Sequence, residues 1–242
     1  MKKVMTKLAL MKILLFAGII SLMSCTKSDT QAQTEEHWVK YYSNITLGDQ
    51  KNYTLGHFLK TKDGTTVKLE DAVNQQQNMS MMFFTEYANT AVFTFPGSSW
   101  DASAYKDFAN NRLFSQTGQG LDSWQQGNLN TGEIAVAASS SSTMTISEFN
   151  ALASSLSWNQ FDQAYKSYNG GQANLSAINY TLPADGELFM FQLNGTVRGF
   201  IYVRNVIPAS ANGGSIRFDM IIEGTSAYTN LTAAKNIQPS KN

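Results

Sequence analysis

The chain has 242 residues, with 18 basic and 18 acidic side chains and a single cysteine, Cys25. Beyond residue 24 it has no cluster of lysine and arginine, so it lacks the charge pattern of a protein that binds nucleic acid. One cysteine can form neither an intramolecular disulfide nor a closed Cys/His zinc site, so stability must come from an ordinary hydrophobic core.

The first 24 residues are organised like a secretory signal peptide. An apolar core over residues 13–22 follows four lysines: Lys2, Lys3, Lys7 and Lys12. A core of about ten residues is far shorter than the roughly 20 that span a bilayer. The stretch that follows, Leu22-Met23-Ser24-Cys25, resembles a bacterial lipobox.

The lipobox resemblance implies that residues 1–24 are removed and that Cys25 becomes the acylated first residue. Several buried acyl chains make a lasting membrane anchor. In lipoproteins an aspartate directly after the cysteine tends to retain the protein at the inner membrane. Here that position is Thr26, so the resemblance implies the outer membrane. Only Asp29 is acidic in the next four residues, which leaves open whether the protein faces the periplasm or the cell surface.

The mature chain divides into three parts. Loss of the signal peptide leaves 14 basic residues against 18 acidic ones, a net charge of −4. Residues 25–37 are mostly polar and are predicted to be a lipidated tether. Residues 38–224 are predicted to form one β-rich domain, and residues 225–242 a polar tail.

The first half of the domain predicts short strands and a tight turn. An aromatic cluster over residues 38–42 is expected to begin the fold. Asp63-Gly64, between β-prone runs, indicates a hairpin because glycine accepts the positive φ of the turn. A helical turn over residues 69–73 and two strands over 79–85 and 91–95 follow, the first of them apolar enough to be buried on both faces.

The second half predicts two helices and an antiparallel meander. Residues 101–110 fit a short helix, 115–130 a long loop and 134–138 a strand. Thr145 and Glu148 fit a capping box, and helical periodicity runs from there to residue 156 and again from about 159 to 169.

The last block shows the clearest strand pattern. Strands are expected over residues 187–193, 199–207 and 215–223, with the first two joined by Asn194-Gly195. In the third strand Ile216, Phe218, Met220 and Ile222 point to one face, which alone is expected to be buried. The expected fold is therefore mainly β, an antiparallel sandwich or curled sheet with two or three short helices.

Two blocks carry a wider resemblance. Ile45-Thr46-Leu47-Gly48 through Phe84, and Leu188 through Asp219, look like uncharacterised Bacteroidota-type lipoproteins with the same order of strands. The second block is also distantly similar to HmuY-type lipoproteins, all-β proteins that hold haem iron through paired His or paired Met. This chain has only His37 and His57, both outside the region that holds those ligands, and Met144 lies in a predicted loop. The resemblance to these lipoproteins leaves haem binding as one alternative function.

Few catalytic arrangements are open to the chain. The lipidated cysteine excludes thiol catalysis, and no Gly-x-Ser-x-Gly elbow or His-Glu-x-x-His motif occurs. A glycan hydrolase needs only two carboxylates at a suitable separation, and four residues could supply them: Asp101, Asp122, Glu133 and Asp162. A carboxylate-dependent hydrolase is the second alternative.

A binding module without catalysis is the leading hypothesis, with no cofactor or metal. Trp100, Trp124 and Trp158 lie near loops rich in Asn and Gln, where indoles can stack on sugar faces while amides bond hydroxyls. They are equally compatible with a core role. Trp124 is the most site-like because its neighbours in sequence are polar or glycine. We therefore expect a lipid-anchored outer-membrane protein that binds a glycan or an outer-membrane transport or assembly complex.

Overall fold

The computed structural model describes residues 37–85, 90–97, 124, 127, 129–208 and 213–225, to which the following account refers. Their strands form two five-stranded antiparallel sheets that do not close into a barrel, accompanied by three short helices. The prediction of a mainly β, antiparallel fold with short helices is confirmed. The predicted signal peptide, Cys25, the predicted tether up to residue 36 and the predicted tail beyond residue 225 lie outside the described residues.

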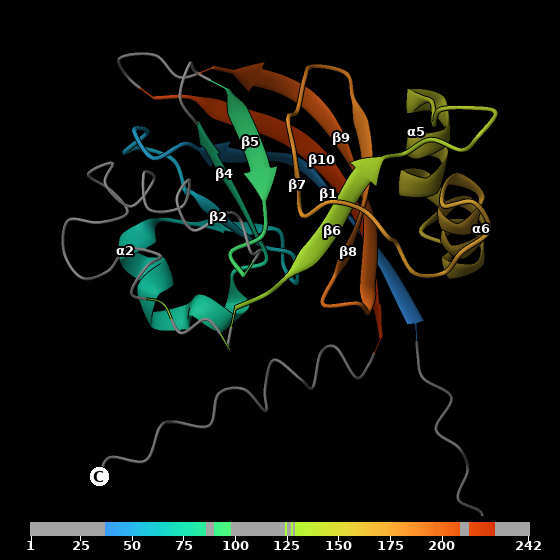
Figure 1. Cartoon of the computed structure of the whole chain (residues 1–242), viewed down its shortest axis with the longest axis horizontal. Coiled ribbons are helices and arrows are strands. Elements are labelled where there is room, and N and C mark those ends of the chain that lie inside the picture. The colour runs from blue at the N-terminus through green and yellow to red at the C-terminus, as the bar shows by residue number, and fades with distance from the viewer. Residues whose placement is uncertain are drawn as a thin grey trace, which may run out of the picture. The chain divides into compact units, whose positions relative to one another are not determined.

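Sheet A has the order β1-β10-β9-β8-β6 and sheet B the order β3-β2-β4-β5-β7 (Figure 1). The strands of sheet A are β1 (His37–Gly48), β6 (Gly132–Val136), β8 (Leu188–Leu193), β9 (Val197–Ile207) and β10 (Ser215–Thr225). Those of sheet B are β2 (Phe58–Lys60), β3 (Thr65–Val67), β4 (Met81–Thr85), β5 (Ala91–Thr94) and β7 (Tyr180–Thr181). The three α-helices are α2 (Leu69–Ala72), α5 (Ile146–Ser155) and α6 (Trp158–Tyr168), and a 3-10 helix, η1 (Val73–Asn78), directly follows α2.

The turns follow the sequence signals closely. Gly64 closes the β2–β3 hairpin with φ of 73°, and Asn194 and Gly195 close the β8–β9 hairpin with φ of 50° and 69°. Thr145 and Glu148 form the predicted capping box at the start of α5. Strand β7 was not predicted because it has only two residues, and apolar alternation can be recognised only over a longer stretch.

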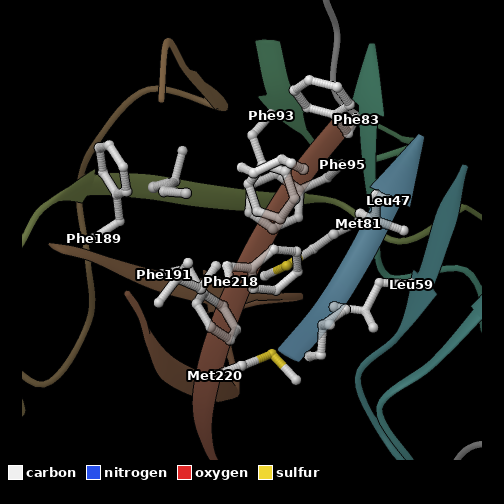
Figure 2. Close-up of a cluster of buried hydrophobic side chains, with 14 of the residues drawn as sticks. Leu47, Leu59, Met81, Phe83, Phe93, Phe95, Phe189, Phe191, Phe218 and Met220 are labelled. Atoms are coloured by element: carbon white, nitrogen blue, oxygen red, sulfur yellow. The ribbon is translucent and has the colours of Figure 1, made fainter. Parts of the chain in front are cut away.

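The main core lies between the two sheets. Large side chains from both sheets meet there, as Figure 2 shows for Phe83, Phe93 and Phe95 of the sheet B segments and for Phe191 and Phe218 of sheet A. The rings of Phe93 and Phe218 contact edge to face with centroids 5.3 Å apart. Their burial supplies the main drive for pairing the sheets.

The outer face of sheet A is also covered, which corrects one expectation. Helices α5 and α6 pack on it and bury Phe149, Phe161 and Tyr165 against Phe200 and Ile221 (Figure 1). In β10 the predicted inward residues do face the core, but the opposite face is buried as well. The alternation predicted an exposed face because Arg217, Asp219 and Glu223 are polar. Asp219 and Glu223 are nevertheless buried, and each forms an ion pair with an arginine of β9.

The outer face of sheet B carries a third cluster under α2 and η1. Strand β4 is buried at every position, with Phe83 facing the inner core and Met82 and Phe84 the outer one, as predicted. On one side the sheets are joined where the Ile134 amide donates to the Ile178 carbonyl at 2.8 Å. At the opposite side the edge strands β1 and β3 lie next to each other. Among the described residues, no helix combines the length and hydrophobicity needed to cross a bilayer.

Candidate functional site

Two polar grooves lie on either side of the edge strand β3. The first, called here the helix-side groove, has a volume of about 660 Å³ and lies between β3 and the α2–η1 segment. The second, the β1-side groove, has a volume of about 490 Å³ and lies between β3 and the middle of β1. Thr66 lines both grooves, so the two adjoin across β3.

The helix-side groove presents mainly groups that form hydrogen bonds. Its lining side chains are those of Thr54, Lys60, Thr65, Thr66, Val67, Lys68, Asp71, Asn74 and Gln75. Hydroxyls can donate and accept, and amides offer both a carbonyl and an NH₂ group. This lining suits a ligand rich in hydroxyl groups better than an apolar one.

The loop of residues 49–55 that borders both grooves is held by its own side chains. The Asp49 carboxylate accepts from the Lys51 amide and from the Thr85 hydroxyl, both at 2.9 Å. Gln50 exchanges two hydrogen bonds with the Thr85 backbone. The Asn52 side-chain oxygen accepts from the Thr54 hydroxyl at 2.8 Å and from the Thr54 and Leu55 amides at 3.2 Å. The loop therefore has a defined conformation despite its short polar sequence.

Tyr53, at the outer end of this loop, is 67% exposed. Its neighbour Thr54 lines the helix-side groove and Leu55 the β1-side groove. The Lys68 ammonium donates to the Tyr53 carbonyl oxygen at 3.0 Å, so the backbone under the exposed ring is fixed from a second direction. Tyr53 itself lines neither groove, but an exposed aromatic ring on an ordered loop provides a large contact surface with little loss of conformational entropy.

The β1-side groove is shaped by a bulge in β1. The pairing of β1 with β10 shifts between Tyr42 and Ile45, and Asn44 within the bulge has φ of 56°. From the same strand, the Tyr42 hydroxyl donates to the Lys62 carbonyl of the β2–β3 hairpin at 2.6 Å. A side chain at Gly64 would clash with the Tyr42 ring, at 2.6 Å from its nearest atom. The hairpin therefore closes directly onto β1.

Asp219 holds this bulge and a second one together. Pairing of β10 with β9 shifts between Arg217 and Phe218, so that β9 has its own bulge at Arg204, whose side chain bonds Asp219. The carboxylate accepts from the Asn44 amide at 2.9 Å, the Tyr41 hydroxyl at 2.8 Å and the Arg204 Nε at 3.0 Å. Bulges often redirect side chains next to functional sites, and here both depend on one buried acid.

The charge state of Asp219 follows from these contacts. Burial alone raises the pKa of a carboxyl, but hydrogen bonds from Arg204, Asn44 and Tyr41 outweigh it and hold the pKa of Asp219 below its usual value. Burial and the bond to this carboxylate raise the pKa of the Tyr41 hydroxyl. The Asp219 carboxyl group is therefore ionised near neutral pH, and its carboxylate shapes the wall of the β1-side groove.

A separate buried charge cluster lies under α6. Arg198 pairs with Glu223 through two hydrogen bonds and with Asp162 at 2.9 Å. The indole NH of Trp158 donates to Glu223 Oε2 at 2.9 Å, and its ring stacks on His37 with centroids 4.3 Å apart. All of the polar groups in this cluster are engaged with one another, which indicates that it fastens α6 to sheet A.

The predicted tryptophans do not meet at one place in the described structure. Trp124 is 3% exposed and packs on Phe58, with ring centroids 5.0 Å apart, in the cluster on the outer face of sheet B. Its polar neighbours in sequence suggested exposure, but its burial depends on residues distant in sequence. Trp158 belongs to the charge cluster under α6. Trp100, the lipobox Leu22, Met23 and Ser24, and Cys25 lie outside the described residues.

The residues considered for haem or for hydrolysis are likewise dispersed. His57, directly before β2, is buried. Met144 is buried between α5, α6 and sheet A. Asp162 is paired with Arg198 and Lys166, whereas Asp101 and Asp122 lie outside the described residues. Within the described part of the chain, no group of three or more His, Cys, Asp or Glu side chains is placed to hold a metal ion.

Sequence reasoning did not find Tyr53, Lys60 or Lys68. A usable signal existed in Asn52-Tyr53-Thr54, because an asparagine that can bond its own backbone two residues on often orders a turn. An aromatic residue inside such a turn is exposed unless another element covers it. The grooves themselves have no local signature, since they join segments of β1, β3 and η1.

No family model, no curated protein and no solved structure matches the chain. The resemblances inferred from sequence therefore stay predictions, and the grooves beside β3 must be interpreted from their own chemistry.

Proposed function

We propose that this chain is a non-enzymatic lipoprotein of the outer membrane that binds a glycan in the two grooves beside β3. The observation that supports it most is the combination of exposed Tyr53, on a loop fixed by hydrogen bonds, with a neighbouring groove lined by hydroxyl, amide and charged groups and an adjoining groove of mixed polar and apolar lining. Tyrosine rings cover the apolar faces of sugars, and polar side chains bond the hydroxyls.

The connectivity of the chain supports a role at a membrane. The lipid at Cys25 would reach the domain through residues 26–36, which lead into the start of β1 at His37. Tyr53 lies beyond the other end of β1, and a strand of 12 residues spans roughly 35–40 Å. Tyr53 would then lie toward the end of β1 opposite to His37, and the β1-side groove alongside the middle of that strand.

Anchoring and ligand binding need separate tests. Replacement of Cys25 by Ala should abolish labelling with radioactive fatty acid and release the protein from membranes. Continued labelling of Cys25→Ala would contradict the anchor but would leave the groove unaffected.

For binding, the lipidated mature protein in detergent micelles is titrated with a panel of soluble neutral and acidic oligosaccharides by calorimetry. Tyr53→Ala should weaken binding of the glycan that responds by about tenfold, while Tyr53→Phe, which keeps the ring, should change it little. Leu156→Ala, which truncates another exposed side chain, is the matched control and should have no effect. A glycan that binds the Tyr53→Ala variant as tightly as the wild type would place its site elsewhere, and a panel without any response would contradict glycan binding.

A further inference from the structure

The helix-side groove carries a local excess of positive charge. Its lining includes two lysines, Lys60 from β2 and Lys68 before α2, against one acid, Asp71 of α2. Among the described residues, these three side chains form no ion pair, either with one another or with a fourth residue. The groove therefore has a net charge of +1 in a mature chain whose net charge is −4.

The two lysines are held in different ways. The Lys68 ammonium uses one of its three donors on the Tyr53 carbonyl oxygen, which directs it along the border of the groove and leaves two N–H groups for a ligand. The Lys60 ammonium has no hydrogen-bond partner within the described part of the chain. Lys60 and Thr65 are paired neighbours on β2 and β3, so the charge stands beside a hydroxyl of the groove lining.

Two other acids, in the neighbouring loops, take part in local hydrogen bonds. The Asp63 carboxylate accepts from the Thr65 amide at 3.0 Å and from its hydroxyl at 2.6 Å. The Asp49 carboxylate accepts from Lys51 and Thr85. These acids are therefore committed to shaping turns, and Asp71 is the acid whose carboxylate faces the groove without such a role.

The geometry points to an acidic glycan as the ligand of this groove, with a sugar carboxylate or sulfate held by Lys60 and Lys68 and sugar hydroxyls bonded by Thr54, Thr66 and Asn74. This inference rests on the proposed glycan binding and specifies its substrate class. Lysine offers a compact point charge, which suits a single anionic group among hydroxyls. Because the mature chain as a whole is acidic, an acidic ligand is repelled less in this groove than over the average of the surface.

The test compares ligands of the same shape that differ in charge. The lipidated mature protein in micelles is titrated with an oligogalacturonate and with its fully methyl-esterified form, and separately with sulfated and unsulfated dextran oligomers. The carboxylated or the sulfated member of its pair should bind more tightly, and its affinity should fall as salt is raised. Whichever pair shows the difference identifies the anionic group.

Charge variants then locate the site. Lys60→Gln should weaken binding of the acidic member by about two- to fivefold and that of the neutral member less, as expected for a partly exposed charge contact. Lys68→Gln also loses the hydrogen bond to the Tyr53 carbonyl, so it should weaken binding of both members, and that of the acidic member more. Asp71→Asn should strengthen binding of the acidic member by a similar factor. Lys166→Gln, on α6 and remote from the groove, is the matched control and should change nothing.

The outcomes separate this inference from the proposed function. Equal binding of charged and neutral members would overturn the acidic ligand while leaving glycan binding intact. If the folded Lys60→Gln and Lys68→Gln variants still prefer the acidic member as strongly as the wild type does, the acidic ligand binds elsewhere and the assignment to the helix-side groove is wrong. If no oligosaccharide of either kind binds, both the function and the inference fail.

Discussion

The Asp219 carboxylate accepts a hydrogen bond from the Asn44 amide at 2.9 Å, and this contact joins the middle of sheet A to the wall of the β1-side groove. Asn44 has a positive φ, which costs energy for a residue other than glycine. The bond to a buried charge offsets that cost. The shape of the groove therefore depends on a side chain that does not line it.

Asp219→Asn should lower the free energy of unfolding by about 1.5–3 kcal/mol. The amide keeps one acceptor for Asn44 but loses the charge that pairs with Arg204 and places an NH₂ group against its donors. Urea denaturation followed by circular dichroism measures the loss. Tyr41→Phe removes one hydrogen bond from the same carboxylate and should cost only about 1 kcal/mol, which makes it the graded comparison. A change below 0.5 kcal/mol for Asp219→Asn would show that the pairs are not stabilising.

Acid should weaken the fold through the same residue. The folded pKa of Asp219 lies below its usual value of 3.8, so on acidification the unfolded chain takes up a proton at this position first. Stability is complete above the unfolded pKa and is lost as the pH falls below about 4 toward the folded pKa. Denaturation midpoints measured from pH 6 to pH 2.5 should decline less steeply for Asp219→Asn than for the wild type. Parallel declines would contradict the lowered pKa.

His57 should produce a second loss of stability in a milder range of pH. Burial lowers its pKa below the usual 6.5 and outweighs the favourable charges of Glu70 and Asp49. Below pH 6.5 the unfolded chain binds a proton that the folded chain excludes, so stability decreases by at most about 1.4 kcal/mol per pH unit. The decrease ends once the pH is below the folded pKa.

His57→Gln provides the test because glutamine does not titrate. The difference in unfolding free energy between variant and wild type is measured at pH 8 and again at pH 5, and it should shift in favour of the variant at pH 5. An unchanged difference would mean that His57 is protonated equally in both states.

Trp124→Ala should lower the free energy of unfolding by about 3–5 kcal/mol, since it removes a buried ring that contacts Phe58. Trp124→Phe, which keeps part of the packing, should cost less. Thermal denaturation of the two variants, together with glycan binding by the folded fraction, distinguishes core from site. Full stability of Trp124→Ala combined with loss of binding would restore its interpretation as a ligand-stacking residue.

Much of the fold could be predicted because its signals are local. The capping box of Thr145 and Glu148 and the turn at Asn194-Gly195 each involve residues within a few positions of one another. The sheet order is not local: β1 pairs with β10, which places His37 beside Thr225. No spacing in the sequence indicates that pairing.

The candidate site was missed for the same physical reason. The β1-side groove joins the bulge around Asn44 to Leu55 and Thr66, and its wall depends on Asp219 from the far end of the chain. Trp124 is buried although its sequence neighbours are polar, because its spatial neighbour Phe58 is apolar. Burial and concavity are properties of distant segments brought together, so composition near one residue does not determine them.

The buried pair of Arg198 and Glu223 leads to the last prediction. Glu223→Ala removes the partner of a buried guanidinium and the acceptor of the Trp158 indole NH, and should lower the free energy of unfolding by about 3 kcal/mol. Asp162 retains part of the charge compensation, which keeps the loss at the lower end of the usual range. Replacing both partners by Met should cost less than Glu223→Ala, because no uncompensated charge then remains. Urea denaturation of the single and double variants measures both values, and a double variant less stable than the single one would show that the ion pair itself contributes net stability to the attachment of α6.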